Sequence, residues 1–323
     1  MTHVSAPSWK ARQPLPRSTW VLAIILVVGW IFLPGFSSID NATNVLRVAA
    51  ILALATYGQT IVLISGGIEF SIGSSVALCS VTSVLALQYW PIGPAFLVGF
   101  VTILAVGIIN GLLISYLRLS AFLVTLGMLL LVHGLAAIVV GGLPVEAPDR
   151  EGIHALSGGA VLGIPVPVLL AAAGAILLHL LLERTILGRS WFLIGSSAPA
   201  AEMTGIKVGR IVFLAYFVAA CFVGLAGLIL TSRVAAGEPN LYPTLPFESM
   251  AACAIGGIPL SGGRGSALNA VIGVLVIAVL NNAIVLLNYP AYTQLALLGV
   301  IMIGAVMAQG FPALKSLSWS RSR

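Results

Sequence analysis

Residues 45–78 read VLRVAAILALATYGQTIVLISGGIEFSIGSSVAL, and this stretch decides the fold class. Its first part is an apolar run of about 20 residues, the length that an α-helix needs to cross a bilayer. The run ends in two adjacent glycines, and a second apolar run follows a few residues later. A helix that glycine interrupts is typical of transport proteins whose broken helices line a binding site.

Apolar runs fill the rest of the chain as well. Of its 323 residues, 59% are hydrophobic and 7% are charged, whereas about 25% are charged in an average soluble domain. A water-facing surface cannot be built from so few charges. Much of the surface must therefore face lipid. We therefore predict an all-α integral membrane protein with about ten transmembrane helices (eight to ten) and Gly-rich broken or re-entrant segments. The predicted spans are 19–35, 45–65, 72–90, 94–117, 120–141, 162–182, 210–231, 247–258, 265–287 and 292–310.

The placement of charge orients these spans. If both termini are cytoplasmic, twelve Lys and Arg residues lie inside, and only Arg47, Arg150 and Arg233 lie outside. Most acidic residues, Glu146 and Glu248 among them, then fall outside. The prediction divides the chain into a cytoplasmic tail (1–18), a transmembrane domain (19–310) and a second cytoplasmic tail (311–323). The net charge of +6 is scattered between apolar runs, which argues against a nucleic-acid partner.

An internal repeat marks two places in the chain. Residues 66–78 read GGIEFSIGSSVAL and residues 256–268 read GGIPLSGGRGSAL, with seven of thirteen positions identical. The repeat is either a duplicated structural element in one orientation or a convergence of Gly-rich turns. Both readings predict structural breaks at the glycines, which are Gly66, Gly67, Gly73, Gly256, Gly257, Gly262 and Gly263.

Few polar side chains interrupt the apolar runs, and Glu69 is the most informative of them. A carboxylate in mid-membrane costs about 2.5–3.5 kcal/mol on the insertion scale. Glu69 therefore either lines a polar pathway or braces a broken helix, or it lies at the wet cytoplasmic interface. The other candidates for a substrate pathway can also serve as interhelical hydrogen-bonding groups. They are Ser71, Asn110, Thr125, Asn281 and Asn282.

Catalytic motifs are absent from the sequence. No G-x-x-x-x-G-K-[ST] loop occurs, so the chain cannot bind ATP phosphates in that way. Residues 260–264, LSGGR, imitate an ATPase signature, but no phosphate-binding loop precedes them. We expect no enzymatic activity, no cofactor and no metal.

The longest inside connection spans residues 183–209. Ser196 or Ser197 can cap a short helix, Pro199 suits its first turn, and Gly205 suits its end. A short helix in this position is either a docking element for a cytoplasmic partner or a plain surface helix.

Several ordered motifs resemble those of the ribose/xylose-type permeases of binding-protein-dependent ATP-binding-cassette (ABC) importers. The resemblance spans about residues 40–310 and extends more distantly to the branched-chain amino-acid permeases. Its motifs are GGIEFSIGS (66–74), AFLVTLGM (121–128), GLPV (142–145), RTILGR (184–189), AAEMTGI (200–206), GGIPLSGGRGS (256–266) and VLNN (279–282). Glu69 stands where that family has Asp.

The resemblance implies a permease of the bacterial inner membrane that moves a sugar inward. It implies three kinds of partner: a cytoplasmic ABC ATPase, a periplasmic solute-binding protein and a second permease subunit, identical or different. The coupling helix of such importers carries an E-A-A-x-x-x-G pattern, in which this chain has Pro in place of Glu. The implied coupling residues are Pro199, Ala200, Ala201, Glu202 and Gly205. A branched-chain amino-acid permease and a stand-alone secondary transporter remain as alternatives.

Overall fold

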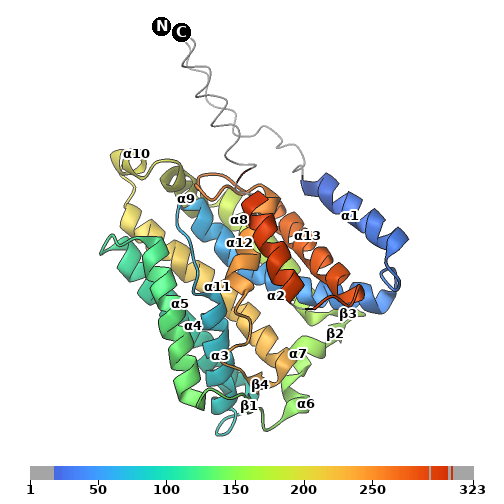
Figure 1. The fold of residues 1–323 in the computed structure, drawn as a ribbon. Helices are drawn as coiled ribbons and strands as arrows, with labels where there is room; N and C mark the ends of the chain where they lie inside the picture. The colour runs from blue at the N-terminus through green and yellow to red at the C-terminus, as the bar shows by residue number, and fades with distance from the viewer. Residues whose placement is uncertain (1–17, 291, 305–306, 308–323) are drawn as a thin grey trace.

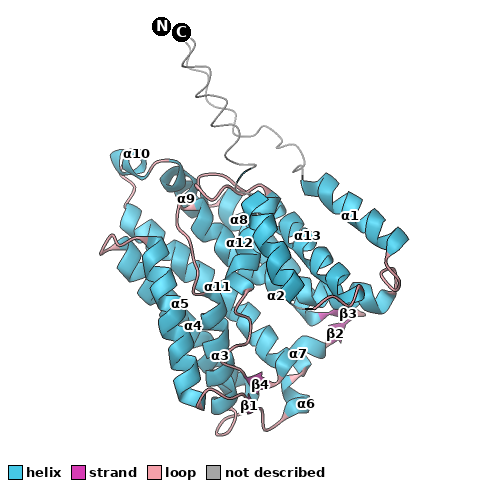
Figure 2. Ribbon diagram, in the orientation of Figure 1, coloured by secondary structure: helices cyan, strands magenta, loops and turns pink. Residues whose placement is uncertain are grey.

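The computed structural model describes residues 18–290, 292–304 and 307. Most of residues 1–18 and all of 311–323, the two predicted tails, lie outside the described residues. The described chain is mostly helical, with four two-residue strands (Figure 2). Six helices are long and apolar enough to cross a membrane. They are α2 (Ile39–Ile64), α4 (Ile92–Ser115), α5 (Ala121–Val140), α8 (Val166–Arg184), α11 (Val208–Val234) and α13 (Ala267–Leu286).

Four shorter apolar helices fall in the remaining predicted spans. Each of the ten predicted spans thus contains a helix, but four helices are too short to count as full crossings by length. The short helices are α1 (Ser18–Phe32), α3 (Ile72–Ala86), α12 (Leu245–Gly256) and a helix at Tyr292–Gly304. The structure confirms the predicted all-α membrane protein, whereas the count of ten spans stays a prediction.

Apart from the short helix predicted between Ser197 and Gly205, the two long connections contain structure that the sequence did not predict. One connection folds into two short helices, α6 (Arg150–Ile153) and α7 (Ala155–Gly158), and four short strands form at the same end of the bundle or close to it. Strand β1 (Val145–Glu146) pairs with β4 (Ala236–Gly237), and β2 (Ala160–Val161) pairs with β3 (Ile164–Pro165), both antiparallel. The connection 183–209 holds α9 (Ile186–Ser196) and α10 (Ala198–Met203). Figure 1 shows α9 and α10 at one end of the bundle and α6, β1 and β4 at the other.

Helix α2 forms the centre of the bundle. It packs against α8, α11, α12 and α13, and 89% of its most apolar 18-residue stretch is buried. Small residues permit these close contacts. Gly58 of α2, for example, lies against the main chain of α11, where a Cβ would come within 2.8 Å of the Ala219 oxygen. Helices α4 and α5, by contrast, leave most of their surface exposed, as lipid-facing helices do.

The two short internal helices start in the interior of the bundle. Helix α3 runs toward β1 and β4, which it contacts, while the segment after α12 reaches the end of α9 (Figure 1). Their first turns meet. A Cβ on Gly73 of α3 would lie 2.8 Å from the Tyr242 oxygen and 3.1 Å from Cδ of Pro246. The arrangement is that of two broken helices whose starts face each other within a membrane bundle.

Candidate functional site

The break after α2 follows from its two glycines. Gly66 adopts a φ of 84°, which a residue without Cβ adopts without strain. The amides of Gly66 and Gly67 donate to the carbonyls of Leu63 and Val62, which closes the end of α2. Residues 67–70 then run without regular secondary structure to a turn at Ser71, where α3 starts. The predicted break at this place is confirmed.

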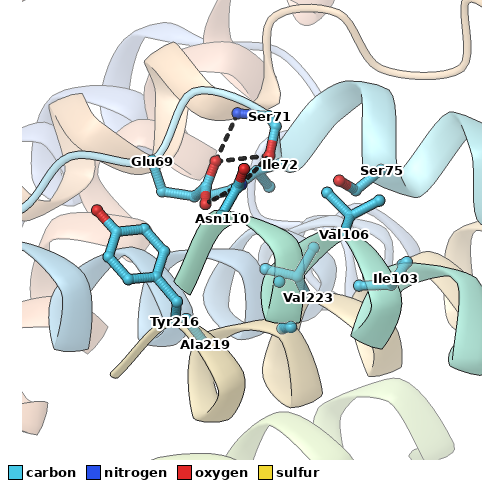
Figure 3. Close-up of a pocket in the computed structure, with 12 residues that line it drawn as sticks. Glu69, Ser71, Ile72, Ser75, Ile103, Val106, Asn110, Tyr216, Ala219 and Val223 are labelled. Carbon is cyan, nitrogen blue, oxygen red and sulfur yellow. Dashed lines mark hydrogen bonds between the residues drawn. The ribbon is translucent and has the colours of Figure 1, made fainter. Parts of the chain in front are cut away.

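Glu69 lies in this break and is buried, with 7% of its surface exposed. Its Oε1 accepts hydrogen bonds from the backbone amide of Ser71 at 2.7 Å and the Ser71 hydroxyl at 2.6 Å. Its Oε2 accepts one from Nδ2 of Asn110 on α4 at 2.9 Å (Figure 3). The interpretation of Glu69 as a wet interfacial residue is therefore wrong. The carboxylate joins the break to α4.

Two further helices hold the same break through one carbonyl. The hydroxyl of Thr125 on α5 donates to the oxygen of Ile68 at 3.2 Å, and the hydroxyl of Tyr216 on α11 donates to it at 3.3 Å. Of the six predicted pathway residues, the structure thus brings together Glu69, Ser71, Asn110 and Thr125. Tyr216, which sequence analysis missed, belongs with them. The irregular backbone here obtains partners from α5 and α11, as irregular backbone inside a membrane requires.

A small cavity adjoins the cluster, between α3, α4 and α11 (Figure 3). About 20 Å³ of it is available to a water molecule, which is room for about one water. Asn110 lines it, and the amide oxygen of this residue is buried without a hydrogen-bond partner. In this conformation the cavity is too small for a sugar.

The start of α12 carries a second carboxylate cluster. Glu248 is buried, with 8% exposed, in the first turn of α12. Its carboxylate accepts hydrogen bonds from Tyr242 at 2.9 Å, Thr244 at 2.7 Å and Nδ2 of Asn281 on α13 at 3.1 Å. Sequence analysis predicts an outside location for Glu248; the structure adds that its side chain is buried within the bundle.

The two clusters share one plan. In each, a glutamate at the start of a short helix accepts from an asparagine of the following long helix. The positive end of a helix dipole favours a carboxylate at this position. Asn281 therefore belongs to the second cluster. Asn282 belongs to neither, because it exchanges hydrogen bonds with Asn41 at the start of α2.

The second Gly-rich segment lies directly against the first. Gly257, with a φ of 93°, ends α12, and the amide of Gly263 donates to the Ile64 oxygen at 3.0 Å. A Cβ on Gly262 would lie 2.9 Å from Cα of Gly66. Gly195 near the end of α9 packs onto the same place. The two copies of the sequence repeat thus meet beside α9.

Helix α10 forms an exposed knob next to this junction (Figure 1). Ser197 caps it by accepting from the amide of Ala200, and Gly205 turns the chain back with a φ of 83°. Both features confirm the predicted short helix. Ala201, however, is only 2% exposed, so the expectation that it faces a docking partner is wrong. The exposed residues are Pro199, Ala200, Glu202 and Met203.

Metal chemistry has no visible basis in the described part of the chain. No group of three or more His, Cys, Asp or Glu side chains lies within reach of one ion in residues 18–290 and 292–304.

Comparison with known proteins identifies the family. Residues 41–306 match the family described as branched-chain amino acid transport system / permease component. The chain belongs to this permease family. No solved structure matches the chain significantly.

Several curated relatives of the permease cover nearly its whole length. The probable ABC transporter permease protein YphD of Escherichia coli K12 is 35% identical over 289 residues, 89% of this chain and 87% of the relative. The ribose import permease protein RbsC of Bacillus subtilis is 35% identical, covering 88% and 89%. The L-arabinose transport system permease protein AraH of Escherichia coli K12 is 30% identical, covering 89% and 88%.

Membership fixes the general character of the permease. It is a multi-pass membrane protein, and its family supplies the membrane subunits of ABC importers, which work with an ATPase and a solute-binding protein. The relatives are permeases and not enzymes.

Proposed function

We propose that the permease moves a sugar, pentose- or hexose-like, into the cell across the bacterial inner membrane, driven by ATP that a partner subunit hydrolyses. The observation that carries this proposal is the similarity to ribose import permeases, at 29–35% identity over about nine tenths of the chain. The buried Glu69 and Glu248 clusters support it, because polar groups inside a membrane bundle mark solute paths or the breaks beside them.

The proposed topology has ten spans and two cytoplasmic ends. Twelve Lys and Arg residues against three support the end that carries α10 as the cytoplasmic end. In this orientation α3 and α12 are half-spans that start near mid-membrane. In each of these two spans, a full crossing then consists of the short helix and an irregular segment.

The cytoplasmic ATPase docks, in this proposal, on the exposed face of α10. Met203 is 90% exposed there, and Glu202 lies 4.0 Å from Arg118 in a surface ion pair. The junction of Gly66, Gly195 and Gly263 connects this end to the break that holds Glu69. Movement of α10 and α9 can thus reach the central clusters through main-chain contacts. Glu69, Ser71, Asn110 and Thr125 act in this proposal as a brace of the break.

A second permease subunit covers the face formed by α3, α5 and residues 238–244. This segment is irregular, and Asn240 and Pro243 in it are exposed. Exposed irregular backbone does not occur against lipid, so protein or water must face it. A second copy of the chain is the simplest cover.

Two alternatives have specific consequences. A branched-chain amino-acid permease would transport leucine in place of a sugar, and a stand-alone carrier would need no ATPase. The test is uptake of labelled D-ribose, L-arabinose and leucine in cells that co-express the permease with its partner ATPase and solute-binding protein. Sugar uptake that needs all three proteins supports the proposal, whereas leucine uptake, or uptake by the permease alone, overturns it.

A further inference from the structure

A groove runs between α3, α5 and residues 239–243, apart from the Glu69 cluster. Its walls include Ser74 of α3, Leu129 and His133 of α5, and Asn240, Tyr242 and Pro243 of the irregular segment. About 50 Å³ of the groove is available to water, more than beside Glu69. Helices α3 and α5 pack together along it (Figure 1).

In the proposed topology the groove lies near the middle of the membrane. Leu129 and His133 are the ninth and thirteenth residues of the twenty in α5, and α5 is long enough to cross the bilayer. The opposite wall begins at Gly73 and Ser74, in the first turn of the half-span α3. Transporters place their solute sites at this depth, beside broken helices.

The irregular wall offers unpaired backbone acceptors. Pro239 and Pro243 have no N–H group. The carbonyls of residues 239–241 accept no hydrogen bond from any residue that the structure describes. Each such group would cost several kcal/mol in hydrocarbon, so this wall must face water, a solute or protein.

Two polar side chains in the groove are also free. Within the described residues, neither the ring nitrogens of His133 nor the side-chain amide of Asn240 has a hydrogen-bond partner. Both groups can donate and accept. The groove therefore holds carbonyl acceptors and two mixed groups, at a depth where an unused polar group is costly.

No Asp, Glu, Lys or Arg side chain lines the groove. The nearest carboxylate in the segment, that of Glu238, accepts the backbone amide of Asn240 at 3.0 Å and is not part of the lining. A free amino acid would bring a carboxylate and an ammonium group into this groove and find no opposite charge. A neutral solute with several hydroxyls would find an acceptor or a donor for each.

We propose that this groove is a solute-binding subsite for a neutral, hydroxyl-rich molecule, in which the carbonyls of residues 239–241, His133 and Asn240 make the hydrogen bonds. The inference rests on the proposed function and deepens it, because it gives a reason for sugar over amino acid. A second subunit supplies the opposite wall of the path, since the groove is open on one side.

Cysteine accessibility tests whether the groove is wet. Cys79, Cys221 and Cys253 are first replaced with Ala or Ser, and Asn240→Cys, His133→Cys or Leu131→Cys is added. Leu131 is the control, because it lies on α5 two residues from His133, is 57% exposed and points away from the groove by helix geometry. We expect a charged methanethiosulfonate reagent to modify Asn240→Cys and His133→Cys at least 10-fold faster than Leu131→Cys in cells that express the full importer. Equal, slow rates at all three positions would overturn the proposal.

Solute protection and uptake test what the groove binds. The transported sugar, D-ribose or L-arabinose, should slow the modification of Asn240→Cys, and Asn240→Leu should reduce uptake at least 10-fold at unchanged membrane level. Leu131→Ala should leave uptake unchanged. If sugar uptake is normal but Asn240→Leu and His133→Leu transport at the parental rate, the subsite fails and the proposed function stands. If leucine is transported and leucine protects Asn240→Cys, the proposed function and the solute class both fail, while the location of the subsite stands.

Discussion

Asn110 on α4 donates a hydrogen bond of 2.9 Å to Glu69, 41 residues earlier in the chain, while its own amide oxygen stays buried without a partner. The bond holds the irregular segment of residues 67–70 against the long helix α4. The free oxygen leaves room for a rearranged bond, because a rotated amide would present an acceptor to the same neighbour. The pair therefore predicts different outcomes for two substitutions of Glu69.

Glu69→Ala should impair transport while the protein still inserts. It removes the acceptor of three hydrogen bonds and leaves buried donors on Ser71 and Asn110, at a cost of about 1–3 kcal/mol for each unsatisfied group. Glu69→Gln should retain uptake to within about threefold, because a rotated Asn110 amide can accept from the new Nε2 group. The measurement is uptake by each variant, normalised to the amount of the protein in the membrane. Wild-type uptake by Glu69→Ala would contradict the brace, and failure of Glu69→Gln would indicate a need for the charge.

The contact of Gly73 with Tyr242 predicts a steric requirement where the two short helices meet. Gly73→Val places carbon atoms against the Tyr242 oxygen and Pro246, contacts that a Cβ already makes at 2.8 and 3.1 Å. Overpacking of this kind costs typically 1–3 kcal/mol. We expect a lower melting temperature of the detergent-purified protein. Gly127→Val on α5 is the control, since a Cβ there meets no atom within 4 Å. Equal melting temperatures for the two variants would contradict the close approach.

The sequence predicted the helices of this fold better than their contacts. Apolar runs locate α4, α5, α8, α11 and α13 to within four residues, because the bilayer sets their composition and length, whereas α2 begins six residues earlier than predicted. Adjacent glycines likewise located the break that holds Glu69. Helix α9 was not predicted, because its mixed composition resembles that of a polar loop. Its burial depends on a tertiary contact, in which Trp191 packs against α11.

The cluster around Glu248 shows why the site was only half predictable. A charge count assigns a glutamate near the edge of an apolar run to water. The structure buries it because Tyr242 and Thr244, from the segment just before α12, and Asn281 of α13 converge on it. Only tertiary packing brings Asn281 to this place. A signal was present in the sequence, since both glutamates are followed by an asparagine within a later span, at distances of 41 and 33 residues.

The proposed orientation predicts which surfaces reagents can reach. Leu162 is 98% exposed in the turn between β2 and β3, and Met203 is 90% exposed on α10. Leu162→Cys should react with an impermeant maleimide in spheroplasts, and Met203→Cys should react only after permeabilisation. The background again lacks the three native cysteines. Reaction of Met203→Cys in sealed spheroplasts would refute the cytoplasmic placement of α10.

The turn after α10 yields the last prediction, which concerns the coupling to the ATPase. Gly205 has a φ of 83°, and a Cβ there would meet no atom within 4 Å, so any effect of substitution comes from the backbone conformation. Gly205→Val should strain the turn, whereas Gly205→Asn should be tolerated, because asparagine adopts this conformation more readily than a β-branched residue. We expect Gly205→Val to lose co-purification of the ATPase and at least 10-fold of uptake, at normal membrane levels.

A charge on the exposed face of α10 tests the docking itself. Ala200→Arg, at an exposed position, should block the approach of the ATPase and leave the fold intact. Ala201→Arg tests something else, because Ala201 is 2% exposed and a long charged side chain there would disturb the packing of α10. The two neighbours therefore separate docking from folding: Ala200→Arg should lower uptake at an unchanged melting temperature, and Ala201→Arg should lower both. If Ala200→Arg and Gly205→Val retain uptake and the bound ATPase, α10 is not the coupling element, and the ATPase must act on another part of the permease.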